Sequence, residues 1–337
     1  MNRVKFANSY EVFKVHLVAT IILDIYMRNL ILFFLFIVNV YGLFGQEKCG
    51  IILDKNSKTP VPYATIYYSR SAIGSFSTEY GNYCISKSNQ KIDSVYISAL
   101  GYLKYSIDYI AFLKADTIYI QNMPIELNDV IVKGKRSKIH TKEIGYHKTS
   151  LIEFKENGYN PNSNQRIATF IAHNSEKWAI KSIHCRVIPK ENKQIQFFRI
   201  RLRIYKNDSL QMLPKEDLLN ENITIDIAPK EKNIEFDLVK YNLKAPNNGF
   251  WISMESIGYI DKDGEYIAIR DHEYGKYTLK DTKKIKLKSI ERITPMYRYI
   301  LTSPKKSAIS SWNNKWKHEN YKEKLNFCFG ATIEKLQ

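Results

Sequence analysis

The sequence predicts an all-β protein made of two antiparallel β-sandwiches that follow an N-terminal signal segment. Beyond residue 46, apolar and polar residues alternate with a period of two rather than 3.6, as in Phe198–Tyr205 (FRIRLRIY). These runs are short and are separated by Asn, Gly, Asp, Lys and Pro, for example in the predicted hairpin turn Asp261–Gly264 (DKDG). We identify no convincing amphipathic helix, long repeat or low-complexity tract beyond the signal segment.

The composition bounds the size and class of the protein. The chain has 337 residues with 24 Tyr and 16 Phe, which is enough apolar material for two ordinary domains and excludes a disordered chain. The net charge is +17. Residues 46–132 hold equal numbers of basic and acidic residues, so the basic excess of the mature chain lies in residues 133–337. Such an excess often indicates nucleic-acid binding. An export segment and the absence of a recognition motif argue against a nucleic-acid partner.

The N-terminus carries the export signal. Leu30–Gly45 is a run of 16 residues without a charge, and Arg28 precedes it. A short basic flank, an apolar run and a small residue at its end are typical of a secretory signal peptide, and a transmembrane helix needs roughly 20 apolar residues. We interpret residues 1–45 as an upstream extension plus signal peptide, with Met27 as the true start.

This interpretation predicts an exported protein of the periplasm or outer membrane. Cleavage of the signal segment and its retention as an anchor both remain open. Membrane contact is expected only through this segment or peripherally. The residues before Cys49 lack the apolar and small residues of a lipoprotein cleavage box, so no lipid attachment is expected.

Four cysteines occur, two in each half of the chain. An even number in an exported protein permits disulfides. The natural pairs are Cys49 with Cys84 and Cys185 with Cys328, and buried thiols are the alternative. The spacing does not fit a zinc site, and no metal is expected.

Residues 46–132 contain five short motifs in a fixed order. They are Gly50–Asp54 (GIILD), Pro60–Ile66 (PVPYATI), Gly74–Tyr83 (GSFSTEYGNY), Gly101-Tyr102 and Leu127–Val132 (LNDVIV). Together they resemble the carboxypeptidase regulatory-like domain, a small transthyretin-like sandwich, in the form common in exported proteins of the Bacteroidota. Tyr83 and Asp129 depart mildly from the family pattern. The resemblance implies an accessory module without peptidase activity, fused to another domain.

A basic linker is expected at residues 133–150, followed by a second β domain at 151–337. The stretch 165–260 is similar to a jelly-roll-like region that follows the regulatory-like domain in exported proteins of the same phylum. That similarity implies no catalytic residues.

Two strands of the second domain carry a basic face. Alternation places three arginines opposite apolar residues on one strand and three lysines on another. The residues are Arg199, Arg201, Arg203, Lys284, Lys286 and Lys288. If the two faces adjoin, they form a cationic plate that could bind phosphate, sulfate or uronate groups. The alternative is a solvated outer face that discourages edge pairing. Trp251, Trp312 and Trp316 either stack on sugars or pack in the core.

Motifs for catalysis are weak. His140 and His173 each have the H-x-x-E spacing of zinc carboxypeptidases, with His272 as a distant third ligand, but that peptidase fold is α/β and this half is all-β. No G-x-S-x-G elbow, P-loop or dinucleotide fingerprint occurs, so no catalytic residue and no cofactor are expected.

We therefore expect a non-catalytic binding or scaffolding protein of the cell envelope. Its partner would be an anionic glycan, lipopolysaccharide or another envelope protein. The alternative is an envelope hydrolase that cleaves glycosides or peptides in its second domain. A cluster of two carboxylates or histidines on the concave face of that domain would favour the hydrolase, and a bare concave face beside the cationic plate would favour the binding protein.

Overall fold

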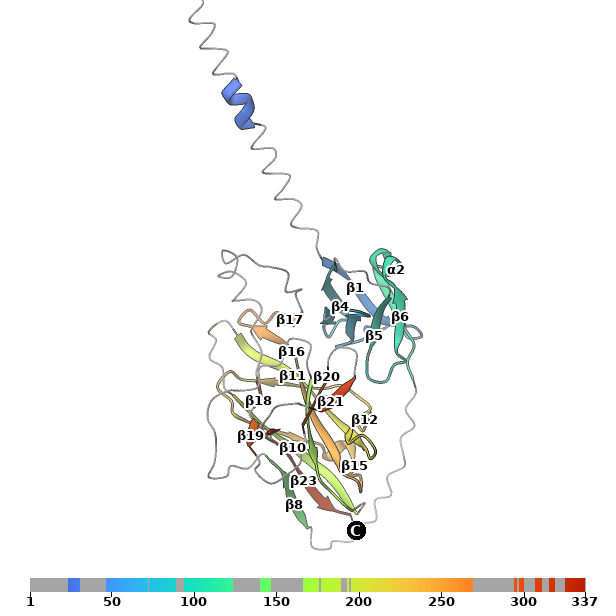
Figure 1. The fold of residues 1–337 in the computed structure, drawn as a ribbon, viewed down its shortest axis with the longest axis vertical. Helices are drawn as coiled ribbons and strands as arrows, with labels where there is room; N and C mark the ends of the chain where they lie inside the picture. The colour runs from blue at the N-terminus through green and yellow to red at the C-terminus, as the bar shows by residue number, and fades with distance from the viewer. Residues whose placement is uncertain are drawn as a thin grey trace, which may run out of the picture. The chain divides into compact units, whose positions relative to one another are not determined.

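The computed structural model describes most of the chain in segments. They are residues 24–30, 47–71, 73–88, 94–123, 140–146, 166–175, 177–188, 193, 195–268, 294–295, 297–299, 307–310, 315–318 and 325–336. Within them strands dominate, which confirms the all-β class (Figure 1). Contacts divide the chain into one unit up to Glu47 and a second from Lys48 onward, and each is described by itself.

In the first unit, residues 24–30 form an exposed stretch of helix. Nearly all of the predicted signal run Leu30–Gly45 lies outside the described residues. No helix in the described part of the chain is long and apolar enough to cross a membrane.

The first β domain contains seven strands and one short helix among its described residues. They are β1 (Glu47–Asp54), β2 (Thr65–Tyr68), β3 (Gly74–Phe76), β4 (Asn82–Ser86), β5 (Ser94–Ser98), β6 (Tyr105–Asp108), helix α2 (Tyr109–Lys114) and β7 (Thr117–Ile120). Two sheets, ordered β4-β1-β7 and β3-β2-β5-β6, enclose one apolar core. One pair departs from the predicted antiparallel pattern. Strands β1 and β7 run parallel, and helix α2 lies in the connection directly before β7.

Local sequence explains the shape of this domain. The Asp108 carboxylate caps α2 by accepting hydrogen bonds from the backbone N–H groups of Ile110 and Ala111. The helix then buries Phe112 against the ring of Tyr83. Gly81 has φ +76°, and a Cβ there would lie 2.5 Å from the Ile52 carbonyl oxygen, so only glycine fits this turn.

One of the two predicted disulfides is present. Cys49 on β1 is bonded to Cys84 on β4, so the bridge ties two strands of one sheet. For the second pair the alternative of buried thiols holds, because Cys185 and Cys328 are buried and carry no disulfide. Burial raises the pKa of the Cys185 thiol to about 12, so this thiol stays protonated and chemically inert.

The second β domain holds the remaining strands. They are β8 (Thr141–Gly145), β9 (Arg166–Ile171), β10 (Trp178–Ile188), β11 (Ile195–Asp208), β12 (Leu213–Asp217), β13 (Ile223–Ile227), β14 (Asn233–Asp237), the 3-10 turn η1 (Val239–Tyr241), β15 (Leu243–Lys244), β16 (Phe250–Asp261), β17 (Tyr266–Ala268), β18 (Thr294–Pro295), β19 (Tyr297–Tyr299), β20 (Ser307–Ser310), β21 (Trp316–His318), β22 (Leu325–Phe327) and β23 (Phe329–Lys335).

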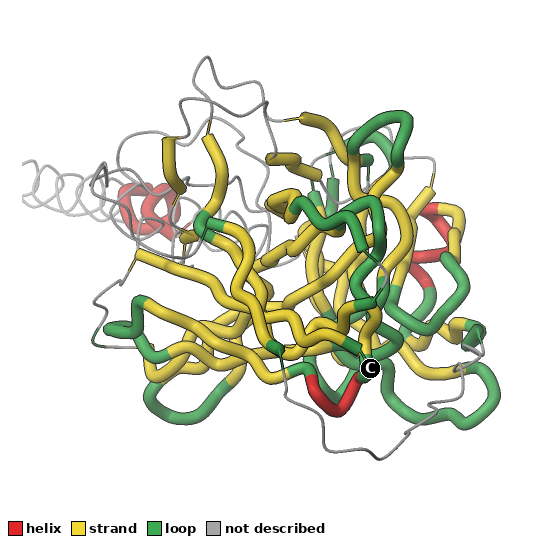
Figure 2. The backbone as a smooth tube through the Cα atoms, turned by 90° about the horizontal axis from the view of Figure 1, so that it is seen from below, coloured by secondary structure: helices red, strands yellow, loops and turns green. Residues whose placement is uncertain are grey.

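These strands form two main sheets that enclose the larger core, and Figure 2 shows the strands stacked in layers. One sheet has the order β14-β10-β23-β8, with β15 and β18 paired to β10. The other, called the large sheet below, has the order β12-β11-β16-β9-β20-β21, with β13 paired to β11 and β17 to β16. The predicted turn at Asp261–Gly264 joins β16 to β17, and Gly264 has φ +83°.

The boundary of the second domain differs from the prediction. Residues 141–145, expected inside the linker 133–150, form β8, which pairs with β23 near the C-terminus. Four of the five side chains of β8 are exposed, so this strand lacks the alternation of apolar and polar residues by which strands are predicted. Residues 124–139 and 147–150 lie outside the described residues.

Candidate functional site

Strand β11 carries the arginines that the sequence singled out. The predicted faces are confirmed: Ile200, Leu202 and Ile204 lie in the core of the second domain. The register pairs Arg201 with Glu255 and Arg203 with Ser253 on the neighbouring strand β16. The outer face of the large sheet is therefore polar on both strands.

The outer face is nevertheless not open to solvent around Arg201. The exposed fraction of Arg201 is 0% and that of Glu255 is 5%. The Arg201 guanidinium donates to Glu255 Oε2 from Nε at 2.8 Å and from Nη2 at 2.5 Å. Arg166 Nε, on the adjacent strand β9, donates to the other carboxylate oxygen of Glu255 at 2.7 Å.

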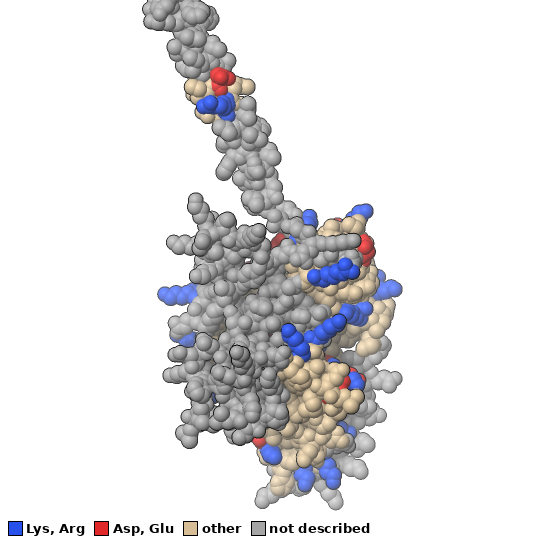
Figure 3. Space-filling model, in the orientation of Figure 1, with Lys and Arg blue, Asp and Glu red and all other residues tan. Residues whose placement is uncertain are grey.

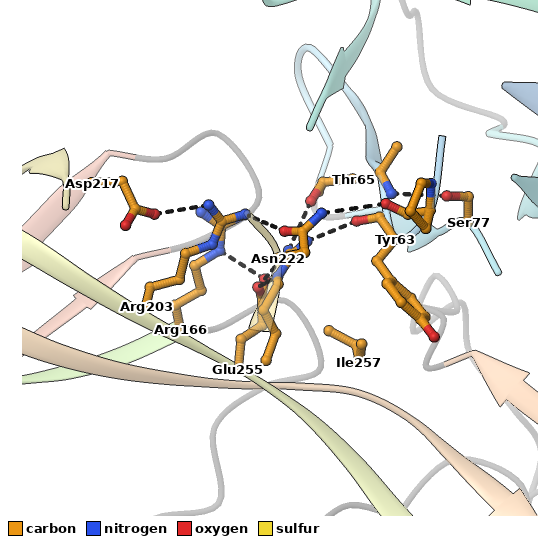
Figure 4. A network of polar contacts seen from close by, with 12 residues as sticks. Tyr63, Thr65, Ser77, Arg166, Arg203, Asp217, Asn222, Glu255 and Ile257 are labelled. Carbon is orange, nitrogen blue, oxygen red and sulfur yellow. Dashed lines mark hydrogen bonds and ion pairs between the residues drawn. The ribbon is translucent and has the colours of Figure 1, made fainter. Parts of the chain in front are cut away.

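The same guanidinium reaches the first domain. Figure 4 shows Tyr63 and Thr65 of that domain close to Glu255 and Arg166 of the second. Arg201 Nη1 donates to the Tyr63 carbonyl oxygen at 2.7 Å, and Nη2 to Thr65 Oγ1 at 3.2 Å. Tyr63 lies just before β2, and Thr65 is the first residue of that strand. We call Arg166, Arg201, Glu255, Tyr63 and Thr65 the interdomain network.

Electrostatics keep this network ionised. Burial alone would raise the pKa of Glu255, but the guanidiniums of Arg166 and Arg201 hold it at about 2. Burial lowers the pKa of Arg201 to about 10, a shift that Glu255 opposes. Both groups are therefore charged at neutral pH, as a buried ion pair with satisfied hydrogen bonds requires.

Arg203 extends the contact on one side of the network. It donates to Asp217 Oδ2 at 2.8 Å and to Asn222 Oδ1 at 3.2 Å. The Asn222 amide in turn donates to the Pro62 carbonyl oxygen of the first domain at 3.4 Å. A second polar path therefore links β11 to the first domain.

Arg199 extends the contact between the domains on the side of the network opposite Arg203. Its Nε and Nη2 donate to the two carboxylate oxygens of Asp226 at 2.6 and 2.7 Å, and Nη1 donates to the Tyr63 hydroxyl at 2.8 Å. The guanidinium also lies over the rings of Tyr63 and Tyr266. Beside it, Tyr67 and Phe76 of the first domain form an apolar cluster that includes Ile257 of β16.

The predicted anion-binding plate is therefore wrong for Arg199, Arg201 and Arg203. Each arginine is bound to a carboxylate of its own sheet, and the first domain covers the face. Lys284, Lys286 and Lys288 lie outside the described residues. Among the described residues on the face seen in Figure 3, the Lys and Arg side chains lie singly and in small groups.

The tryptophans that can be placed belong to packed clusters. Trp251 is 1% exposed, and its indole N–H donates to Asn207 Oδ1 at 2.9 Å. Trp316 packs edge-on against Tyr205. Trp312 lies outside the described residues. Trp251 and Trp316 therefore form no sugar-stacking platform.

A Ser–His–Glu cluster lies on the sheet that contains β10. Ser182 Oγ is 3.2 Å from His184 Nε2, and it also contacts Glu235 Oε1 at 3.1 Å. In a catalytic triad a carboxylate orients the histidine. Glu235 instead contacts the serine, and Thr332 Oγ1 lies 2.8 Å from the same His184 nitrogen.

The zinc alternative finds no support in the residues that can be placed. Among the described residues from Lys48 onward, no three His, Cys, Asp or Glu side chains converge at metal-ligand distances. His140 is exposed beside β8, and His173 contacts the Ser175 carbonyl oxygen. Glu176 and His272 lie outside the described residues.

One cavity was not foreseen from the sequence. It has a volume of about 690 Å³ and lies between the first domain and β17 of the second. Its walls come from segments more than 200 residues apart, such as Cys49 and Ala268, and no local motif marks them.

Comparison with known proteins adds no family. No protein-family model matches the chain, and no curated protein matches it. A structure of the cysteine protease and lectin-like domains of Cwp84, a surface layer associated protein of Clostridium difficile, is similar at 12% identity and a TM-score of 0.32. That match covers 52% of this chain and 32% of the other, so this chain spans about a third of that length.

A second structure is the clostridial cysteine protease Cwp84 after propeptide cleavage. It is similar at 8% identity and a TM-score of 0.35, over 87% of this chain and 71% of the other. At these TM-scores neither likeness supports an argument about this chain.

Proposed function

We propose that this chain is an exported, non-catalytic scaffolding or binding protein of the cell envelope. It would present two β-sandwiches in one fixed orientation to another envelope protein. The observation that carries the proposal is the interdomain network. The arginines of β11, which were candidates for ligand binding, are used to hold the first domain on the large sheet.

The energetics favour a rigid connection over a hinge. Taking Arg201 and Glu255 out of water costs several kcal/mol per ion, and good geometry with further hydrogen bonds must compensate. Separation of the two domains would remove the hydrogen bonds to Tyr63 and Thr65 and expose the apolar cluster around Phe76. Domain motion is restricted where an interface also has a hydrophobic part, and here the apolar cluster of Phe76 and Ile257 supplies that part.

Export is supported by two observations that do not depend on each other. The sequence carries a signal-like apolar run before residue 46. The Cys49–Cys84 bridge belongs to an oxidising compartment, because cytosolic reductants keep such thiols reduced. We further propose that the first domain is the regulatory-like accessory module and that the second is the jelly-roll-like region of exported Bacteroidota proteins.

Counting thiols in cells tests export. Cells are lysed in acid, and the denatured chain is alkylated with a maleimide–polyethylene glycol that adds mass per thiol. The exported protein should gain two adducts, from Cys185 and Cys328. A matched variant without residues 30–45 stays in the cytosol and should gain four. Four adducts on the native protein would contradict export.

Binding tests separate the candidate partners. Because the β11 arginines are engaged, the full chain should not bind lipopolysaccharide vesicles through them. Vesicle binding could instead be salt-sensitive and depend on the lysines outside the described residues. If it disappears when Lys284, Lys286 and Lys288 are replaced by Gln, the partner is an anionic glycan. Glycoside or peptide hydrolysis that Ser182→Ala abolishes would replace the scaffold by the hydrolase alternative.

A further inference from the structure

The cavity between the two domains has the size and position of a ligand site. Its volume of about 690 Å³ lies within the range of roughly 300–1,000 Å³ for small-molecule pockets, which often lie at domain interfaces. Strands β1, β3 and β4, the turn after β3 and the start of β7 line one side, and β17 lines the other. The interdomain network keeps these two sides together.

Part of the wall is apolar and held in place. Ile51, Phe76, Ile267 and the Cys49–Cys84 bridge supply this surface. Phe76 is 1% exposed and packs in the cluster shared by the two domains. Tyr266, also in the wall, donates its hydroxyl to the Ile257 carbonyl oxygen at 3.0 Å, which anchors β17.

The rest of the wall offers hydrogen-bonding groups. Thr78 Oγ1 accepts from the backbone N–H groups of Tyr80 and Asn82 at 3.2 Å, so its own proton remains available to a ligand. Within the described part of the chain, the side chains of Asn82 and Thr117 make no hydrogen bond. Asp116 uses only Oδ1, towards Lys48 at 3.0 Å.

A buried hydroxyl adds an independent observation. Tyr83 lines the cavity and is 3% exposed, and its hydroxyl has no hydrogen-bond partner among the described residues. Buried polar atoms are nearly always hydrogen-bonded. This hydroxyl is closed to a water-sized probe, so a ligand in the cavity reaches it only when the lining around Tyr83 shifts.

The charge of the cavity selects the class of ligand. Among the described residues of the lining, Asp116 is the one carboxylate, and its exposed side chain is paired with Lys48. A neutral site gives no advantage to phosphate, sulfate or uronate. An apolar surface beside hydroxyl, amide and carboxylate groups suits a sugar, whose C–H face packs on apolar atoms while its hydroxyls donate and accept. We propose that this cavity binds a neutral mono- or disaccharide.

Saturation-transfer NMR and calorimetric titration of the purified full chain test the proposal. The probes are glucose, N-acetylglucosamine, maltose, cellobiose, mannobiose and diacetylchitobiose, with sialyllactose as the anionic comparator. At least one neutral sugar should bind saturably, with an affinity that does not change between low and high salt. No saturable binding by any neutral sugar, or preference for sialyllactose that salt weakens, would overturn the proposal.

Three variants locate the site. Asn82→Ala and Thr117→Val each remove one hydrogen-bonding side chain and should weaken binding about tenfold. Asn233→Ala, an exposed asparagine on β14, is the matched control and should bind as the native chain does. Ala268→Trp fills the cavity and should abolish binding while the melting curve stays cooperative. A folded Ala268→Trp or Asn82→Ala chain with native affinity would place the sugar elsewhere and contradict the proposal.

Discussion

The two faces of the large sheet are both buried, but by different means. The inner face of β11 and β16 packs Ile200, Leu202 and Met254 against the second sheet of the same domain. The outer face packs Arg201 and Glu255 against the first domain. The first burial is apolar and non-directional, whereas the second depends on charges and on hydrogen bonds of defined geometry.

This difference assigns different roles to the two faces. An apolar core tolerates small shifts between its layers, since contacts of similar energy can re-form. The Arg201 guanidinium donates at once to Glu255 Oε2, Tyr63 O and Thr65 Oγ1. These three hydrogen bonds form together in only one orientation of the two domains. The inner face therefore provides stability, and the outer face specifies how the two domains are oriented.

The largest effect is expected from Glu255→Ala. Removing the carboxylate leaves the buried positive charges of Arg201 and Arg166 without a counter-charge. This should lower the free energy of unfolding by about 3–5 kcal/mol. Urea unfolding should show this loss, and the first domain should become sensitive to protease before the second. Glu216→Ala removes the partner of exposed Lys206 and, as the control, should cost less than about 1 kcal/mol. Equal losses in the two variants would contradict the role of the outer face.

Leu202→Ala probes the inner face at the position between two of the arginines. A buried leucine replaced by alanine costs about 2–5 kcal/mol through lost burial and a cavity. Here both domains should unfold together at lower urea, without earlier cleavage of the first domain. Selective release of the first domain by this variant would show that the two faces are not separable.

Acid should weaken the outer face alone. The pKa of Glu255 is about 2 in the folded chain, against an ordinary value of 4.5. Between pH 4.5 and pH 2 this carboxyl group is therefore protonated in the unfolded chain but ionised in the folded chain. The stabilisation, about 3 kcal/mol, is complete above about pH 5 and is lost as the pH falls from 4.5 towards 2. Urea titrations at pH 3 and pH 6 should show a smaller difference for Glu255→Gln than for the native chain. An unchanged difference would exclude Glu255 as the source.

The smallest effect is expected at the edge of the contact. Arg199→Lys keeps the charge but loses the two-pronged hydrogen bond to Asp226, and should cost about 1 kcal/mol. Asp226 is partly exposed, so solvent screens this pair more than the pair of Arg201 with Glu255. A loss as large as that of Glu255→Ala would move the centre of the contact from Arg201 to Arg199.

Sequence periodicity predicted the faces of β11 but not what covers them. Alternation is a local property, and it separated Arg201 from Leu202 correctly. The acceptor of Arg201 in the first domain is 138 residues away in the sequence. A face that contacts another domain and a face that contacts water have the same polar pattern, so alternation alone cannot separate the two.

The local character of sequence patterns also explains the outcomes for the cysteines and for the cavity. The Cys49–Cys84 pair is 35 residues apart within one small domain, so pairing by halves of the chain found it. The same rule failed for Cys185, because its position on a core strand depends on strand pairing across the whole second domain. The cavity was missed because its polar residues, such as Asn82 and Thr117, belong to no motif.

The orientation of the two domains is the central claim, and a distance measurement tests it most directly. Lys55 and Lys230 are exposed, lie in different domains and can carry nitroxide labels after replacement by cysteine. Pulsed electron resonance should give one narrow distance distribution in the native background and a broad one after Glu255→Ala. A broad distribution in the native background, or one that Glu255→Ala leaves narrow, would contradict the claim that the outer face fixes the two domains.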